Sequence, residues 1–597
     1  MKRQEFDSYI KDADFSELFN QLGWNNSDQI SPVLVDVEDE RFKLECVAQR
    51  NGFKVYACKV SAIPMMTVIK SIDKRLRKSS NDYILIFIAE QMHHEWIVPV
   101  KTVDKRVLVP IEYTTAAQLD FLYSKHTDLS FDIEEETTIL DVTKRVNAAF
   151  ELNSEKVTKD FYAGFKKQHN SFADFISGIS VESDKQWYVS VMLNRLMFCY
   201  FIQKKNFLDF NPNYLREKLE LCKKEQGKDK FFKSFYKSFL VQLFQGGLNS
   251  PNHENPEFKA RFGRIPYLNG GMFDQHQIEK QYADIDIADE AFENLFDFFD
   301  KYKWHLDTRI EASGKDINPD VLGYIFEQYI NDRAQMGAYY TKEDITNYIG
   351  KNCILPFLIT DAIKRFGKDV SFIWDSLKNS GDRYIYDSVK KGVELSLPDN
   401  IAVGVDTEKP NLLERRKDWN TPTPSEYGLP TEIWRETVER RKRYEELKQK
   451  IENGEILNIN DFITYNLDIT SFVQDFLAQT TDIDFVRCFY ESLRNVSILD
   501  PTCGSGAFLF AALNILEPLY ETCVDRLDSV KEEIKDKYRS NIQYFIYKNI
   551  ILRNLYGVDI MAEATEIAKL RLFLKMVAVV EADRKLPNLG LDPPSRH

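Results

Sequence analysis

The chain has 597 residues, which at roughly 150 residues per domain predicts about four domains. Lys and Arg number 79 against 93 Asp and Glu, and the resulting net charge of −14 argues against a protein that coats nucleic acid through bulk positive charge. Because 43% of the residues are hydrophobic and 29% are charged, the fibrous and wholly disordered classes are excluded.

No apolar run approaches the roughly 18 uncharged residues that span a bilayer, and the start MKRQEFDSYIKDADF has no apolar core of a secretory signal. We therefore expect a cytoplasmic protein without membrane contact. The eight cysteines form no C-x-x-C pair, which favours reduced thiols over disulfides and predicts no metal site.

Residues 1–135 predict a small mixed α/β domain. Strands are expected at 53–60, 83–89 and 95–100, with a helix at 67–78 between the first two. This order of strand, helix and strand is similar to half of a nuclease core of the PD-(D/E)xK type.

Such a nuclease needs an acid two residues before Lys59 to hold Mg²⁺, and Ala57 occupies this position. Asp36, Glu38 and Glu45 could supply carboxylates from elsewhere, but their spacing gives no support. A degenerate or docking domain is the favoured interpretation, and a Mg²⁺-dependent endonuclease is the alternative.

Residues 155–335 predict a helical region. The segment 187–201 (WYVSVMLNRLMFCYF) is apolar on most faces, which indicates a helix inside a bundle. The segment 263–273 combines a proline and paired glycines with large apolar residues and predicts a buried, ordered turn. Residues 321–330 predict a further helix with apolar residues at helical spacing.

Residues 376–455 are charge-rich and carry several prolines. They predict an insertion or linker within one larger domain. The segment 436–450 (ETVERRKRYEELKQK) predicts a solvated helix, since a charge run of this kind is usually a wet face.

The most informative segment is 496–510 (VSILDPTCGSGAFLF). An apolar strand ends at Asp500, a turn with Gly504 and Gly506 follows, and a helix begins near Ala507. Glycines let the backbone approach a ligand, and an acid at the strand end accepts hydrogen bonds or offsets a cationic ligand. The pattern matches neither the dinucleotide-binding motif G-x-G-x-x-G nor the phosphate-binding motif G-x-x-x-x-G-K-[ST]. Two interpretations therefore stay open for this segment alone, a nucleotide-binding turn and a plain tight turn between strand and helix.

A second strand that ends at Asp559 is expected in the segment YGVDI (556–560), followed by a helix at 563–576. In a Rossmann-like unit an acid at the position of Asp559 typically binds ribose hydroxyls. A helix-capping or surface aspartate is the alternative. In a third segment, 336–349 (MGAYYTKEDITNYI), Thr341 can cap a helix that starts near Glu343, which leaves the preceding aromatic pair without an explanation.

The motifs G-x-Y-Y-T, D-P-x-x-G-S-G-x-F and G-V-D-I occur in this order. With them the chain resembles the N6-adenine DNA methyltransferases of type II restriction-modification systems, and most closely the large type IIG-like proteins. PYLNGG at 266–271 and LGYIFE at 322–327 are also similar to the helical region of that family. The resemblance covers roughly residues 155–585.

The resemblance implies S-adenosylmethionine as cofactor and double-stranded DNA as partner. Tyr340 and Thr341 would line the cofactor pocket, with Lys342 where the family usually has proline. Asp559 would bind the ribose hydroxyls and Ile560 would lie against the adenine ring. The amino acid end of the cofactor would be held by Asp500, Thr502, Cys503, Gly504 and Gly506.

Members of that family methylate an adenine that is flipped out of the duplex. An Asn/Asp-Pro-Pro-aromatic motif accepts hydrogen bonds from the exocyclic amine, and its ring stacks on the base. Asp592, Pro593 and Pro594 are similar to this motif, but Ser595 replaces the aromatic residue and no apolar strand precedes Asp592. We expect the chain to stop before the catalytic motif and the target-recognition domain, so that no other catalytic residue is assigned.

The predicted fold is α/β. A Rossmann-like methyltransferase domain in residues 336–597, incomplete at the C-terminus, follows the helical region and the N-terminal domain. The predicted function is site-specific adenine methylation of DNA in a restriction-modification or phage-defence system, by a chain that is a fragment. The alternatives are an inactive product that acts through protein contacts and the endonuclease named above. The sequence carries no indication of an oligomeric state.

Overall fold

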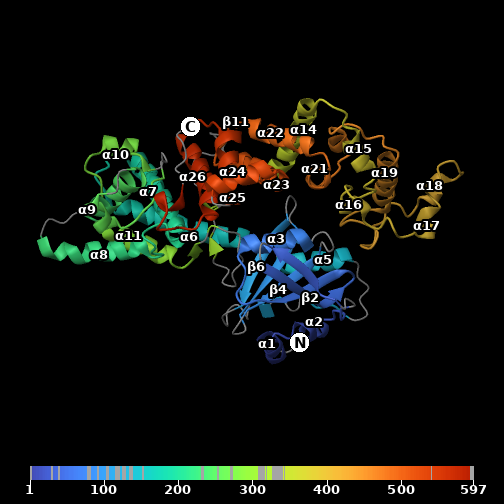
Figure 1. Ribbon diagram of the computed structural model, residues 1–597, viewed down its shortest axis with the longest axis horizontal. Coiled ribbons are helices and arrows are strands. Elements are labelled where there is room, and N and C mark those ends of the chain that lie inside the picture. The colour runs from blue at the N-terminus through green and yellow to red at the C-terminus, as the bar shows by residue number, and fades with distance from the viewer. Residues whose placement is uncertain are drawn as a thin grey trace. The chain divides into compact units, whose positions relative to one another are not determined.

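The computed structural model describes residues 3–591 with gaps (Figure 1). The gaps are 28–30, 38–39, 77–81, 90–92, 102–105, 114–121, 124, 126–128, 133–138, 151–153, 230–233, 252–254, 269–272, 305, 307–315, 318, 320, 324, 326–340, 342 and 539–540. The chain divides into two compact units, Met1–Asn331 with Phe573–Arg596, and Asp332–Leu572. Each unit is described by itself below.

The first unit contains a six-stranded sheet in the order β1-β2-β3-β4-β5-β6. Its strands are β1 (Val33–Val37), β2 (Glu40–Arg50), β3 (Phe53–Lys59), β4 (Tyr83–Ile88), β5 (His94–Lys101) and β6 (Arg106–Tyr113). Neighbouring strands are antiparallel except β3 and β4, which are parallel and joined through the helix α3 (Met66–Leu76). The strands and the helix predicted for this part of the sequence are therefore present.

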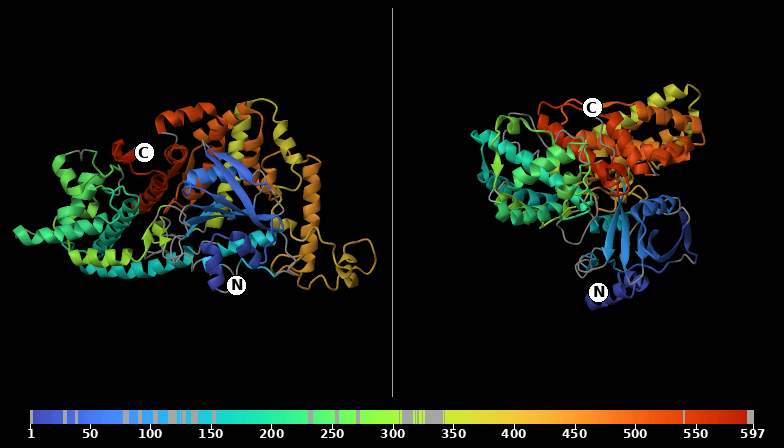
Figure 2. Two further views of the ribbon diagram at one scale, coloured as in Figure 1. Left: turned by 60° about the horizontal axis from the view of Figure 1, so that its bottom comes forward. Right: turned by 60° about the vertical axis from the view of Figure 1, so that its left-hand side comes forward.

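Two apolar cores lie on the opposite faces of this sheet, because successive side chains of a strand point to opposite faces. On β4, Ile84 and Ile86 belong to one core, while Leu85 and Phe87 belong to the other. The helices α1 (Arg3–Lys11), α2 (Phe15–Gln21) and α5 (Ile139–Ala149) contribute to the first core, and α3 contributes to the second. Two further views of the sheet and its helices are given in Figure 2.

The helical region of the first unit has an aromatic core around the long helix α7. Its helices are α6 (Ser154–Asp174), α7 (Glu182–Lys204), α8 (Tyr214–Asp229), α9 (Pro256–Phe262), α10 (Gln277–Gln281) and α11 (Asp289–Phe299), with the π-helices η2 (Tyr236–Leu240) and η3 (Gln242–Leu248). Short strand pairs are β7 (Ile176–Ser177) with β8 (Asp286–Ile287), and β9 (Lys303–Trp304) with β10 (Asp316–Ile317). The predicted burial of α7 is confirmed, since its residues from Leu196 to Gln203 are all buried.

One buried ion pair stabilises the middle of this region. Arg195 Nη1 donates to Glu279 Oε1 at 2.7 Å, and both side chains are less than a tenth exposed. Tyr188 donates its hydroxyl to the same oxygen at 2.8 Å, and Arg195 Nη2 donates to the carbonyl of Asp274 at 2.7 Å. Because both charges are hydrogen-bonded several times, we interpret this cluster as structural.

The first unit also includes the segment after residue 572. Its short helix η6 (Pro587–Gly590) contains three consecutive left-handed residues, Asn588, Leu589 and Gly590. Asn588 accepts from the amide of Tyr267 at 2.5 Å and donates to the Tyr267 carbonyl at 2.9 Å. The predicted turn at 263–273 thus contacts a segment more than 300 residues later in the sequence. Ile265 and Leu268 of the turn are buried, as expected, and residues 269–272 lie in a gap.

The second unit contains a two-stranded parallel sheet among helices. Its elements are α14 (Glu343–Phe366), α15 (Ser371–Lys378), α21 (Ile469–Gln479), α22 (Ile483–Asn495), β11 (Ile498–Asp500), α23 (Ala507–Arg526), α24 (Asp528–Tyr538), α25 (Ile542–Asn549), the π-helix η5 (Ile550–Asn554), β12 (Leu555–Gly557) and the first part of α26 (Ala562–Ala578). α14 packs against α22 and α23, and α23 packs against both strands. The sheet is thus covered on one face by α23.

The charge-rich segment 376–455, for which an insertion is predicted, contains the short helices α16 (Asp387–Lys390), α17 (Asp399–Ala402) and α18 (Leu412–Arg415) and the longer α19 (Trp434–Glu452); α20 (Asp461–Thr464) follows it. α19 was expected to be solvated, but one of its faces is buried. Arg440 on that face pairs with Glu432 at 2.8 Å and donates to the carbonyls of Val389, Lys391 and Tyr427. A charged side chain is buried here because three backbone carbonyls and the Glu432 carboxylate together accept its donors.

The expected mixed α/β fold is confirmed. The Rossmann-like arrangement stays a prediction, since the described part of the second unit shows two parallel strands. Among the helices described, α23 alone is long and apolar enough to cross a membrane, and 56% of its apolar 18-residue stretch is buried within the protein. It also carries Glu517 and Glu521, so it is consistent with a core helix.

Candidate cofactor site

The candidate site lies at the carboxyl ends of β11 and β12. The two strands are in parallel register, with Asp500 opposite Gly557. Beyond the strands, the amide of Val558 donates to the Asp500 carbonyl and the amide of Cys503 donates to the Val558 carbonyl, both at 2.9 Å. The pairing therefore continues past β12, which ends at Gly557, two residues before the predicted strand end at Asp559.

A buried amide fixes the other end of these strands. Asn554 donates to the carbonyls of Leu493 and Val496 at 2.7 and 2.8 Å, and it accepts from the hydroxyl of Tyr520 at 3.0 Å. The chain leading into β12 is thereby held against the end of α22, directly before β11. The register that brings the two strand ends together depends on these hydrogen bonds.

The turn after β11 requires its two glycines. The φ angles of Gly504 and Gly506 are +50° and +92°, in the left-handed region that favours glycine. A Cβ atom at Gly506 would lie 3.1 Å from the Cβ of Ala568 on α26, so this side of the turn is packed. A Cβ atom at Gly504 would meet no atom of the described residues within 4 Å, so this side is open among them.

Asp500 and Asp559 lie on either side of the turn and differ in their hydrogen bonds. Asp559 accepts from the amides of Gly504 at 2.8 Å and Met561 at 2.9 Å. Asp500 accepts from the amide of Thr502 at 3.1 Å through Oδ1, while its buried Oδ2 has no hydrogen-bond partner within the described residues. Burial, together with the nearby charge of Asp559, raises the pKa of the Asp500 carboxyl.

Cys503 lies beneath the turn as a packing residue. Its side chain is buried, and a Cβ atom at Gly557 would lie 2.9 Å from its Sγ. Burial and then the charges of Asp500 and Asp559 raise the pKa of the Cys503 thiol to about 11. The thiol is therefore neutral at physiological pH and is not an activated nucleophile.

The structure brings most of the predicted cofactor residues together. Those that lie in or beside the turn are Asp500, Thr502, Cys503, Gly504, Gly506 and Asp559. Ile560 follows them and is fully exposed. Thr341 lies two residues before the start of α14 at Glu343. The remaining predicted residues, Tyr340, Lys342, Asp592, Pro593 and Pro594, lie outside the described residues.

Sequence reasoning missed one residue that contacts the turn. Arg571 of α26 is buried and donates to the carbonyl and the hydroxyl of Ser505. The available signal was an arginine within the largely apolar helix EATEIAKLRLFLKM. A buried arginine in an apolar stretch indicates a specific acceptor, because an unpaired charge would be costly there.

Of the two described acids considered for a nuclease, Glu45 lies near enough to Lys59 to feel its charge, while Asp36 pairs elsewhere. Glu45 lies opposite Ala57 on neighbouring strands, but its carboxylate accepts from Lys43 at 2.7 Å. Asp36 pairs with Arg41 at 2.6 Å, and Glu38 lies in a gap. No group of three or more His, Cys, Asp or Glu side chains suited to a metal ion occurs in the described part of the chain.

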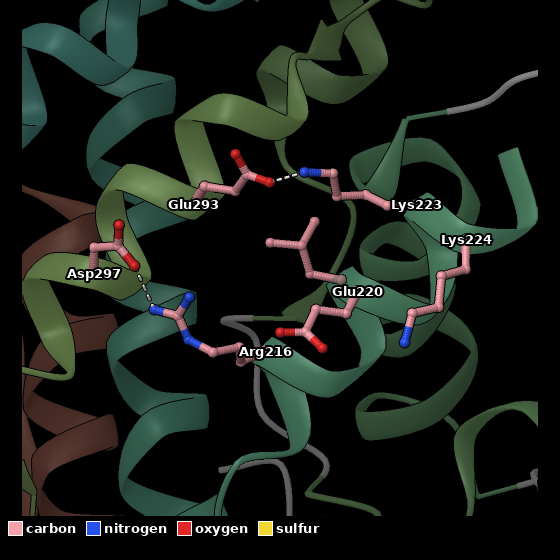
Figure 3. Close-up of a pocket in the computed structure, with 7 residues that line it drawn as sticks. Arg216, Glu220, Lys223, Lys224, Glu293 and Asp297 are labelled. Atoms are coloured by element: carbon pink, nitrogen blue, oxygen red, sulfur yellow. Dashed lines mark hydrogen bonds and ion pairs between the residues drawn. The ribbon is translucent and has the colours of Figure 1, made fainter. Parts of the chain in front are cut away.

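A surface groove of about 480 Å³ lies between α8 and α11 in the helical region (Figure 3). Lys223 pairs with Glu293 across it, and Arg216 pairs with Asp297 at 2.9 Å. These ion pairs join the two helices to each other. We therefore interpret the groove as a salt-bridged helix contact, and the candidate site remains at the turn.

The turn and both strands fall within a region that matches a known family. The family model described as "MmeI, DNA-methyltransferase domain" matches residues 472–586. A curated protein of Methanocaldococcus jannaschii, named "Putative type II restriction enzyme and methyltransferase", is 27% identical over 430 residues, which is 68% of this chain and 27% of that relative. The chain thus spans about a quarter of the relative's length. No solved structure matches. Residues 472–586 are therefore similar to the MmeI-type DNA-methyltransferase domain, and the chain is homologous to a protein named as a putative type II restriction enzyme and methyltransferase.

Proposed function

We propose that the chain binds S-adenosylmethionine at the turn between β11 and α23 and that its function is methylation of adenine N6 in double-stranded DNA. The system would be restriction-modification or phage defence. One observation carries the proposal: two carboxylates at the ends of adjacent parallel strands lie beside a glycine turn that is open over Gly504. The match of this region to a DNA-methyltransferase domain supports the same function.

Asp500 fits the amino acid end of the cofactor. Its Oδ2 atom is buried without a hydrogen-bond partner in the described part of the protein, which costs about 1–3 kcal/mol for a typical buried acceptor. The ammonium group of S-adenosylmethionine is a charged donor that would satisfy this atom. The open space over Gly504 lets the ligand approach the backbone beside that carboxylate.

Asp559 and Ile560 fit the nucleoside end. The Asp559 carboxylate oxygens each accept one backbone amide, and each keeps a lone pair that could accept from a ribose hydroxyl. Ile560, the next residue, is fully exposed and would lie against the adenine ring. Thr341 would line the pocket from the segment before α14, with Tyr340 as its neighbour.

When bound, S-adenosylmethionine supplies a methyl group on a positively charged sulfur. The residues at the turn would bind and orient it, and Cys503 would support the turn from below as a neutral thiol. For the adenine amine, Asp592, Pro593 and Pro594 remain the candidate acceptor group, and the choice of adenine N6 rests on the resemblance of the three sequence motifs.

Calorimetric titration of S-adenosylmethionine into the chain tests the site. Asp500→Asn keeps the shape of the side chain but removes its charge, and we expect the Kd to rise at least about tenfold, which corresponds to about 1.4 kcal/mol. Asp528→Asn is the matched control, because Asp528 is almost fully exposed on α24. Equal affinities of the wild type and Asp500→Asn would show that the pocket is elsewhere.

The reaction is tested by transfer of tritiated methyl groups to unmethylated genomic DNA, followed by digestion to nucleosides. Label in N6-methyladenine is the expected result, and label in a methylated cytosine would refute the proposed base.

The competing function is protein contact without methylation. It is favoured by Leu499, Tyr556 and Val558, which expose 47–61% of their surface at the two strands. Cofactor binding without transfer of label would favour that function.

A further inference from the structure

Arg571 connects α26 to the middle of the candidate cofactor turn. Its Nη1 donates to the Ser505 carbonyl at 2.9 Å and to the Ser505 hydroxyl at 3.2 Å. Its guanidinium lies over the ring of Phe510 at 4.4 Å from the centroid. Arg571 is 8% exposed and Ser505 is 1% exposed, so these contacts are made away from bulk solvent.

The same face of α26 packs against the turn through a second residue. Ala568 precedes Arg571 by three positions, which places both side chains on one face of the helix. Ala568 makes the close approach to Gly506, whose carbonyl accepts from the amide of Phe510 at 2.9 Å in the first turn of α23. One face of α26 therefore supports the turn and the start of α23 together.

Support at Ser505 acts on the middle of the turn. It lies between Gly504 and Gly506, and glycine is the residue with the greatest backbone freedom. Hydrogen bonds that fix Ser505 therefore restrict the two flexible residues on either side of it. An apolar side chain at position 571 would bury without the desolvation cost of a guanidinium, but it could not hold the Ser505 carbonyl.

We propose that Arg571 is a positioning residue that holds the turn in its cofactor-binding conformation and acts selectively on recognition of the amino acid end of S-adenosylmethionine. This inference rests on the proposed function. The selectivity follows from the layout of the site, because Ser505 belongs to the turn beside Asp500, whereas the nucleoside end is assigned to Asp559 and Ile560 after β12. Asp559 accepts one amide from the turn, that of Gly504, but the Met561 amide holds its other oxygen independently of the turn.

The test compares two ligands by calorimetric titration. S-adenosylmethionine carries the amino acid end, and 5′-methylthioadenosine is the same nucleoside without it. In Arg571→Lys, which keeps the charge but loses the planar fork of donors, the Kd for S-adenosylmethionine should rise about tenfold while that for 5′-methylthioadenosine stays within about twofold. Equal losses for both ligands, or no loss for S-adenosylmethionine, would overturn the inference.

Hydrogen exchange provides a readout that needs no ligand. In Arg571→Lys the amides of residues 504–506 should exchange at least about tenfold faster, while those in the middle of α23 are unchanged. Unchanged exchange in the turn would overturn the inference. Ser505→Ala, which removes the hydroxyl acceptor and leaves the carbonyl, should also accelerate the exchange, but by less than Arg571→Lys. Exchange that is unchanged in Ser505→Ala, or faster than in Arg571→Lys, would also count against the inference.

Lys569→Met is the matched control on the same helix. Lys569 is exposed and pairs with Glu566, so its loss should change neither the ligand affinities nor the exchange of the turn. The two proposals fail separately. A wild-type chain that does not bind S-adenosylmethionine removes the proposed function, whereas a wild-type chain that binds it, with Arg571→Lys unchanged in affinity and exchange, removes only the role of Arg571.

Discussion

The two glycines of the turn predict opposite consequences for the same substitution. Gly504→Ala introduces a methyl group into open space, whereas Gly506→Ala introduces one 3.1 Å from the Cβ of Ala568. Both residues have positive φ, so both substitutions place a Cβ atom in the left-handed region. The difference between the two variants therefore isolates what surrounds each glycine.

The left-handed conformation costs a residue with a Cβ atom about 1–2 kcal/mol. This is the whole expected loss of stability for Gly504→Ala, because the added methyl group meets no atom within 4 Å in the part of the chain that the structure describes. Gly506→Ala adds the close contact with Ala568, and overpacking typically costs about 1–3 kcal/mol more. For binding the order is reversed, because the methyl group at Gly504 occupies the space assigned to the cofactor, and we expect the Kd for S-adenosylmethionine to rise at least about tenfold.

Thermal unfolding by calorimetry and titration with S-adenosylmethionine are measured on both variants. Gly504→Ala should have the smaller stability loss and should nevertheless lose affinity. If Gly504→Ala binds the cofactor as the wild type does, the open space over Gly504 is not the binding site. If it is destabilised as much as Gly506→Ala, the packing argument is wrong.

Three further predictions concern buried polar groups. The raised pKa of Asp500 makes its ionisation unfavourable in the folded chain, so Asp500→Asn should raise the free energy of unfolding at neutral pH. The affinity of the wild type for the cofactor should weaken as the pH falls through that pKa. Titration of the wild type and the variant with S-adenosylmethionine across the acidic range checks this dependence and its loss in the variant. Asn588→Ala removes the amide pair with the backbone of Tyr267 and should cost about 1–3 kcal/mol, which hydrogen exchange of the segment around residue 588 measures. Arg440→Met leaves the buried carboxylate of Glu432 without its cation and should destabilise the segment 376–455 by about 3–5 kcal/mol. Limited proteolysis should then cut this segment, while the affinity for the cofactor is retained.

The turn was predictable from the sequence because each of its features is set locally. An apolar strand, an acid at its end and two glycines before a helix follow one another between Ile498 and Ala507. The approach of Asp559 was predictable from one additional assumption, namely that the two strands are parallel neighbours, because parallel strands end at the same edge of a sheet. The register places Asp500 opposite Gly557, and the carboxylate of Asp559 reaches the turn.

The acceptors of the buried arginines could not be predicted, because they are distant in the sequence. Arg571 donates to a residue 66 positions earlier, and Arg440 donates to carbonyls 51 and 49 positions earlier. Helical periodicity distinguishes apolar from polar faces, and it does not contain the position of a backbone carbonyl in another segment. The charge run of α19 was therefore assigned to solvent, although Arg440 is 6% exposed.

The different hydrogen bonds of the two carboxylates argue for a cationic ligand rather than a phosphate. A glycine turn before a helix also suits phosphates, which are stabilised by free backbone amides. Here the amide of Gly504 is already donated to Asp559, and Asp500 presents a buried oxygen that lacks a donor in the described structure. Two carboxylates beside the turn would repel a phosphate, whereas the ammonium and sulfonium groups of S-adenosylmethionine are attracted by them. Inorganic pyrophosphate, which carries no nucleoside, should consequently fail to compete with S-adenosylmethionine for the wild-type chain, and competition would show that the turn binds phosphates and that the assignment of Asp500 is wrong.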